Sequence, residues 1–112
     1  MQVPLQITVR HMPQSPALEE RIRENAAKLD EFYRGLISCH VVVEQQARHS
    51  EQGRWFNVRI VVRVPGHELI VNRDHDEDVY VALRDAFASL TRRLEDVVRR
   101  QHGQVKAHPA SR

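Results

Sequence analysis

The stretch WFNVRIVVRVPGHELIVNR, residues 55–73, predicts a β-hairpin. Residues 55–64 alternate between two sides, which is typical of a strand with one buried face. The apolar side carries Phe56, Val58, Ile60, Val62 and Val64. Pro65-Gly66 is a turn signal, and residues 68–73 form a short return strand. One face of the sheet should therefore be buried and the other exposed.

Two further strands and a helix precede this hairpin. Residues 5–10 and 37–46 show the same alternation of apolar and polar positions. Between them, Ser15 is a candidate helix cap, and Pro16 suits the first helical position. The helix has one apolar stripe, made by Leu18, Ile22, Ala26, Leu29 and Tyr33. We expect Gly35 to end this helix as a left-handed cap. The polar stretch 47–53, between the predicted strands 37–46 and 55–64, is expected to form a connecting loop.

A second helix is predicted near the C-terminus. It should be capped by Asp78, run from Val79 to about Gln101, and stop at Gly103. Its apolar stripe consists of Tyr80, Leu83, Phe87, Leu90, Leu94 and Val97. We therefore expect one domain, residues 1–102, followed by a flexible tail, residues 103–112.

The resulting order, β-α-β-β-β-α, defines an α+β fold. Because each helix has a single apolar stripe, both should pack on one face of a four-stranded antiparallel sheet. The 112 residues suit one domain, and no apolar run approaches the roughly 20 residues of a membrane-spanning helix. The N-terminus lacks the pattern of a signal peptide. Cys39 is the single cysteine, so a reduced, cytoplasmic compartment is expected.

Charge is unevenly distributed along the chain. The 17 Lys and Arg against 15 Asp and Glu leave a net charge of +2. Lysine occurs only at Lys28 and Lys106, and the other basic residues are arginines, which favour bidentate contacts with phosphate or carboxylate. Residues 74–78 carry −4, whereas residues 79–112 hold seven basic and three acidic residues, a balance of +4. The last helix is therefore the basic element.

The arginines of this helix fall into two rows on a helical wheel. One row holds Arg84, Arg92 and Arg99, within about 80° of one another, and the other holds Arg93 and Arg100. Such rows suit the phosphates of a nucleic acid. They equally suit a solvated helix face on which Glu95 and Asp96 pair with the arginines. Charge alone leaves both interpretations open.

Four short motifs mark the chain. They are LQITV at residues 5–9, Lys28-Leu29 followed by Phe32-Tyr33, DVYVAL at residues 78–83 and LTRRL at residues 90–94. In their order and spacing, from Leu5 to about Lys106, they resemble the ribosome hibernation promoting factor family in its short form. Members of this family are also called ribosome-associated inhibitors or Y proteins. None of the motifs is a catalytic signature.

The resemblance implies a fold like the double-stranded RNA-binding domain and a role on the ribosome. Members of the family bind the small ribosomal subunit between head and body and cover the messenger RNA and transfer RNA sites. Their contacts with ribosomal RNA come mainly from basic residues of the two helices. Lys28, Arg92 and Arg100 match such positions, and Arg84, Arg93 and Arg99 are further candidates. We expect a translation-silencing factor of resting or stressed cells, with no cofactor, metal, membrane or small-molecule substrate.

The sequence also departs from the family. Its members usually have lysines where this chain has Asn25, Ser89 and Asp96. Arginines elsewhere on the last helix would have to replace them with a different geometry. The family's long form has a second domain that pairs ribosomes, and this sequence shows no counterpart. Ribosome dimerisation by this chain alone is therefore not expected.

Other classes of function remain open. A protein-interaction or dimerisation module would use the exposed sheet face, which carries Trp55, Val61, His40 and Val42. An enzyme is disfavoured because no nucleophile, base and orienting group occur at workable spacing. The triplet Asp74-His75-Asp76 suggests a metal site, but consecutive loop residues seldom converge on one ion. Cys39 is expected to be a small buried hydrophobic residue.

Overall fold

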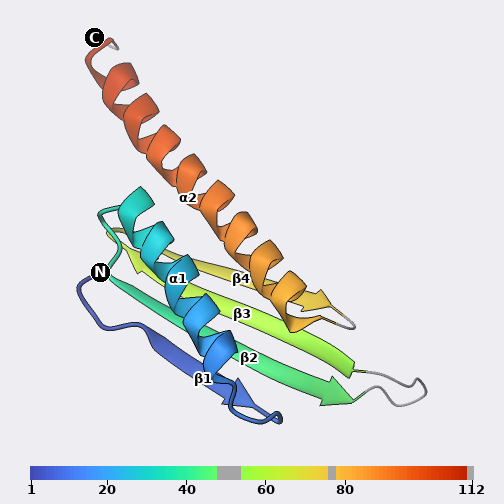
Figure 1. Ribbon diagram of the computed structural model, residues 1–112. Coiled ribbons are helices and arrows are strands. Elements are labelled where there is room, and N and C mark those ends of the chain that lie inside the picture. Colours follow the sequence, from blue (N-terminus) through green and yellow to red (C-terminus); the bar gives the residue numbers. More distant parts are fainter. Residues whose placement is uncertain (48–53, 76–77, 111–112) are drawn as a thin grey trace.

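Six elements follow one another in the predicted order (Figure 1). The computed structural model describes residues 1–47, 54–75 and 78–110. The elements are β1 (Gln6–Arg10), α1 (Pro16–Phe32), β2 (Ser38–Ala47), β3 (Arg54–Val64), β4 (His67–His75) and α2 (Val79–Ala110). The α+β class, the order β-α-β-β-β-α and the four-stranded sheet are thus confirmed. Of residues 47–53, which are predicted to form a connecting loop, only Ala47 is described, and it belongs to β2.

The strands pair in the order β1-β2-β3-β4. The pairs β2–β3 and β3–β4 are antiparallel, with Ile60 opposite both Val41 and Val71. β1 instead runs parallel to β2, as its arrow in Figure 1 shows, so the prediction of a wholly antiparallel sheet is wrong. The reason is the connection: α1 carries the chain back along the sheet, and a strand–helix–strand crossover joins parallel strands.

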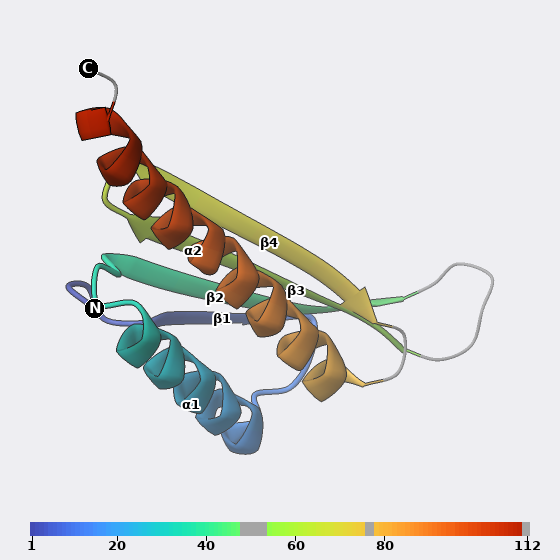
Figure 2. The ribbon, with the colours of Figure 1, turned by 90° about the horizontal axis from the view of Figure 1, so that it is seen from above.

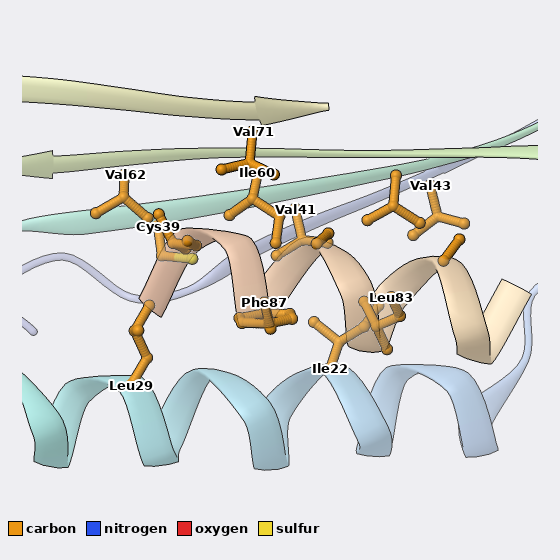
Figure 3. Packing of buried hydrophobic residues seen from close by; sticks show 14 of the residues in the cluster. Ile22, Leu29, Cys39, Val41, Val43, Ile60, Val62, Val71, Leu83 and Phe87 are labelled. Carbon is orange, nitrogen blue, oxygen red and sulfur yellow. The ribbon is translucent and has the colours of Figure 1, made fainter. Parts of the chain in front are cut away.

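Both helices cover the same face of the sheet, as predicted (Figure 2). Ile22 and Leu29 of α1 point toward the strands, whereas Leu83 and Phe87 of α2 lie between α1 and strand residues such as Ile60 (Figure 3). All five belong to one buried cluster. All five predicted apolar positions of β3 are buried, which confirms the alternation. Each large apolar side chain removed from water in this layer contributes roughly 1.5–3 kcal/mol.

The N-terminal cap of α1 agrees with the prediction, whereas its C-terminal end does not. At the start, the Ser15 hydroxyl accepts a hydrogen bond from the backbone N–H of Leu18 at 3.2 Å, which confirms the cap. At the end, Tyr33 is already extended, and Gly35 does not adopt a positive φ, so the predicted left-handed cap is wrong. Gly35 is small for another reason: a Cβ there would lie 2.9 Å from Cε2 of the Tyr33 ring.

α2 begins as predicted and ends later. Asp78 Oδ1 accepts a hydrogen bond from the N–H of Tyr80 at 2.9 Å, which confirms the cap. The helix continues to Ala110 and projects beyond the sheet (Figure 1), so the predicted stop at Gly103 is wrong. A glycine inside a helix costs only about 1 kcal/mol relative to alanine, so Gly103 does not by itself end the helix. The flexible tail at residues 103–112 remains a prediction. No helix of the described chain has the length and apolarity to cross a membrane.

Candidate nucleic-acid interface

Two grooves flank α2, one on the side of α1 and one on the side of β4. The α1–α2 groove consists of two adjoining hollows of about 450 and 370 Å³. Asn25, Lys28 and Arg84 line both hollows, with Arg21 and Tyr80 toward one end and Phe32 and Phe87 toward the other. The β4–α2 groove is a hollow of about 600 Å³. Its charged residues are Arg73, Arg92, Arg93, Glu95, Asp96 and Arg99.

The six residues predicted to bind ribosomal RNA divide between these places. Lys28 and Arg84 lie in the α1–α2 groove, whereas Arg92, Arg93 and Arg99 lie in the β4–α2 groove. Arg100 is exposed and lines neither groove. The row predicted on the helical wheel, Arg84 with Arg92 and Arg99, is thus split between two hollows, because α2 itself forms the ridge between them.

Two cations of the α1–α2 groove, Lys28 and Arg84, are loosely held, whereas Arg21 pairs with Glu24 at 3.6 Å. Lys28 is exposed, and within the described part of the chain it has no ion pair. Among the described residues, the one ion-pair partner of Arg84 is its neighbour on α2, with Nη2 at 3.4 Å from Oδ1 of Asp85. The Arg21 guanidinium stacks over the Tyr80 ring at 5.4 Å, which joins the two helices at one end of the groove. Lys28 and Arg84 therefore remain available to an anionic ligand.

The arginines of the β4–α2 groove have more partners. Arg93 donates a hydrogen bond to the backbone carbonyl of Ile70, and Arg73 donates one to the Ser89 hydroxyl at 3.1 Å. Arg99 pairs with Asp96 at 3.0 Å, so the predicted competition from this acid is present in the structure. Arg92 is exposed, and no ion pair holds it among the described residues. These contacts fix several guanidinium groups against the domain and leave Arg92 the most available.

Three groove residues, Arg73, Arg21 and Phe32, are not among the residues predicted to bind RNA. Arg73 has the same strand parity as the buried Val71, so an arginine where an apolar residue is expected was a usable signal. Arg21 and Phe32 share a row with Lys28 at helical spacing, seven residues before it and four after it. Their role depends on where α2 lies, which local periodicity does not specify.

The sheet face away from the helices carries the residues predicted for protein interaction. His40, Val42, Trp55 and Val61 are all half-buried among their neighbours. His40 Nε2 lies 2.8 Å from the Thr8 hydroxyl on β1, which ties this face together. We call this surface the open sheet face.

The remaining conspicuous residues have structural settings. Asp74 lies in β4 and accepts a hydrogen bond from Asn57 at 2.6 Å, whereas Asp76 and the His75 side chain lie outside the described residues. Across the residues that are described, no three potential metal ligands gather. Cys39 is buried, as predicted, and desolvation raises the pKa of its thiol to about 12. The thiol is therefore protonated and unreactive at neutral pH.

The fold and its grooves define a small α+β domain with cations gathered on its helix layer. Residues 5–102 match the family described as sigma 54 modulation protein / S30EA ribosomal protein. The chain therefore belongs to this family of ribosome-associated factors, the hibernation factor family that its motifs resemble. The family is not a class of enzymes.

Two solved structures share the fold. A ribosomal subunit interface protein from Coxiella burnetii is 17% identical, with a TM-score of 0.69 over 83% of this chain and 94% of that one. The N-terminal domain of Protein Y from Thermus thermophilus is 21% identical, with a TM-score of 0.70 over 87% of this chain and 99% of that one. At these identities the likeness concerns the fold.

Proposed function

We propose that this chain binds the small ribosomal subunit in the cytoplasm of resting or stressed cells and blocks its messenger RNA and transfer RNA sites. Membership in a family of ribosome-associated factors supports a ribosomal partner. The relative from Coxiella burnetii is itself described as a ribosomal subunit interface protein.

One observation carries the proposal: cations gather in grooves on both sides of α2. Arg21, Lys28 and Arg84 outnumber Glu24 in the α1–α2 groove. In the β4–α2 groove, four arginines outnumber two acids. Folded RNA presents rows of phosphates along a curved surface. The guanidinium group of an arginine beside α2 can bind two oxygens of one phosphate through two parallel hydrogen bonds.

The mechanism is occlusion, without a bond made or broken. Phosphate contacts supply affinity and release counterions, and the shape of the domain supplies specificity for folded RNA. A rigid sheet behind α2 holds the arginine-bearing helix in place, because Leu83, Leu90 and Leu94 are fully buried against it. Ligands that need the same RNA surface are then excluded for as long as the domain is bound.

Charge reversal in the β4–α2 groove tests the proposal. Arg92→Glu combined with Arg99→Glu should weaken co-sedimentation with purified small subunits at least about tenfold, because two phosphate contacts become repulsive. Arg59 and Arg63 lie two residues on either side of Val61 in β3 and therefore on the open sheet face. Arg59→Glu with Arg63→Glu is the matched control and should bind like the wild type. Unchanged co-sedimentation of the groove variant would contradict the proposal.

A second candidate function uses the open sheet face. Val61 pairs with Ile70 across β3 and β4, and Ile70 is 42% exposed, so a small apolar row is present. A protein partner or a second copy would dock there. Salt distinguishes the two: RNA binding weakens steeply between low and moderate salt, whereas an apolar interface does not.

A further inference from the structure

Phe32 is an apolar residue that the core does not use. It is the last residue of α1, and 47% of its surface is exposed. A ligand that covers an exposed phenylalanine ring gains hydrophobic free energy from the contact. The ring lies beside the hollow of about 370 Å³ at one end of the α1–α2 groove.

The hollow combines an apolar wall with two positively charged side chains. Its apolar wall is made by Leu29, Phe32, Phe87 and Ala88. Each helix also contributes one positively charged side chain to the hollow, Lys28 from α1 and Arg84 from α2. The size lies within the range of about 300–1,000 Å³ typical of small-ligand sites. A fitting ligand therefore combines a flat apolar surface with a negative charge.

We propose that this end of the groove holds one unpaired RNA nucleotide, with its base against the Phe32 ring and its phosphate between Lys28 and Arg84. The inference rests on the proposed function and names the kind of RNA that the site takes. An unstacked base offers a π-face to an aromatic ring, and its phosphate is the anion that Lys28 and Arg84 require. A duplex keeps its bases stacked and would leave Phe32 uncovered.

Two polar residues of the hollow fit a base edge. The side-chain N–H of Asn25 donates to the Arg21 carbonyl at 2.9 Å, and the Thr91 hydroxyl donates to the Phe87 carbonyl at 2.9 Å. Both residues line the hollow. The Thr91 hydroxyl has its one donor engaged and keeps an acceptor oxygen. Asn25 keeps its side-chain oxygen and its second N–H. Both residues can therefore accept from the amino or imino group of a base, and Asn25 can also donate to the base. An apolar peptide segment would leave these acceptors and both cations unused.

Substitution of Phe32 separates stacking from simple apolar contact. Phe32→Leu keeps an apolar side chain without a ring, and Phe32→Tyr, the matched control, keeps the ring. With purified small subunits, Phe32→Leu should raise the dissociation constant at least about fivefold, while Phe32→Tyr stays within about twofold of the wild type. Thermal melting of all three proteins should agree, because Phe32 is exposed. Wild-type affinity of Phe32→Leu, or equal losses in both variants, would overturn the nucleotide site.

A second probe removes the bases and keeps the charge. The wild type should bind a 12-nucleotide oligouridine more tightly than an abasic ribose-phosphate strand of the same length at low salt, and Phe32→Leu should bind both strands alike. A wild type that binds both alike, or neither, would overturn the site.

The two failures are distinguishable. Wild-type protein that does not bind small subunits contradicts the proposed function itself. Wild-type binding that Arg92→Glu with Arg99→Glu weakens, but Phe32→Leu does not, contradicts only the nucleotide site.

Discussion

The helix layer and the open sheet face are two exposed surfaces of the same domain, and they distribute charge differently. On the open sheet face, arginines and acids are balanced among the described residues: Arg10, Arg59 and Arg63 share it with Glu44, Glu68 and Asp74. Arg63 lies opposite Glu68, and Arg10 opposite Glu44, in the strand register. On the helix layer, cations gather in the two grooves beside α2. A net charge of +2 therefore says little about either surface. What distinguishes a phosphate-binding surface is the local excess of cations and how many of them lack partners.

The largest expected effect separates the two surfaces directly. Lys28→Glu with Arg84→Glu, in the α1–α2 groove, should weaken small-subunit binding by about a hundredfold, since charged hydrogen bonds contribute roughly 1.5–3 kcal/mol each. Arg59→Glu with Arg63→Glu changes charge by the same amount on the open sheet face and should have little effect. Filter-binding titration at fixed salt measures both. Equal losses would mean that the two surfaces do not differ in function.

The next effect concerns the core that lies between the two surfaces. Because burial raises the pKa of the Cys39 thiol from 9.0 to about 12, the folded protein retains a proton that the unfolded chain loses. The free energy of unfolding should therefore be unaffected by this group below pH 9 and fall by about 1.4 kcal/mol per pH unit between pH 9 and 12.

Cys39→Val is the control for this slope. It removes the thiol and keeps an apolar side chain, and urea unfolding at pH 8, 9 and 10 should show a shallower decline than in the wild type. Identical slopes in the two proteins would contradict a buried, protonated thiol.

A smaller expected effect is an increase in affinity for the small subunit. Asp96 pairs with Arg99 at 3.0 Å and places negative charge in the β4–α2 groove. Asp96→Asn should free Arg99 and tighten small-subunit binding by about two- to fivefold, in keeping with roughly 0.2–1 kcal/mol for an exposed ion pair. Asp85→Asn offers a comparison beside Arg84. Weaker binding of Asp96→Asn would show that the acid orients Arg99 rather than competing for it.

The smallest expected effect is a change in the salt dependence of RNA binding. A plot of log affinity against log salt should become shallower by about 0.7–0.9 on Arg92→Gln, because one phosphate contact is lost. Arg59→Gln should leave the slope unchanged. A shallower slope in Arg59→Gln would extend the RNA-binding surface to the open sheet face.

The sequence predicted those features that depend on local pattern. Strict alternation in β3 places Ile60 in the core and Val61 on the other face, and the Ser15 and Asp78 caps depend only on nearby backbone. The direction of β1 was mispredicted, because it depends on a crossover rather than on any residue of the strand. Gly35 was misread because its constraint comes from the Tyr33 ring and not from its own φ.

The candidate site was predicted in composition but not in arrangement. Arg92 and Lys28 were identified, yet their assignment to separate grooves depends on the placement of α2 against α1 and β4. The contact of Arg93 with the Ile70 carbonyl joins residues 23 positions apart in the chain. Such contacts follow from tertiary packing, which no helical wheel represents.

The parallel pairing of β1 has a consequence for how the domain assembles and opens. β2, β3 and β4 form two antiparallel pairs between strands adjacent in sequence, and β3 and β4 are joined by a tight turn. β1 is a short edge strand, separated from its partner β2 in the chain by the whole of α1. Pairing over a longer sequence separation costs more loop-closure entropy, and edge elements open at lower free energy. We therefore expect the domain to fold from the β2–β4 strands outward and to open first at β1. The amide hydrogens of β1 should then exchange with solvent sooner than those of β3.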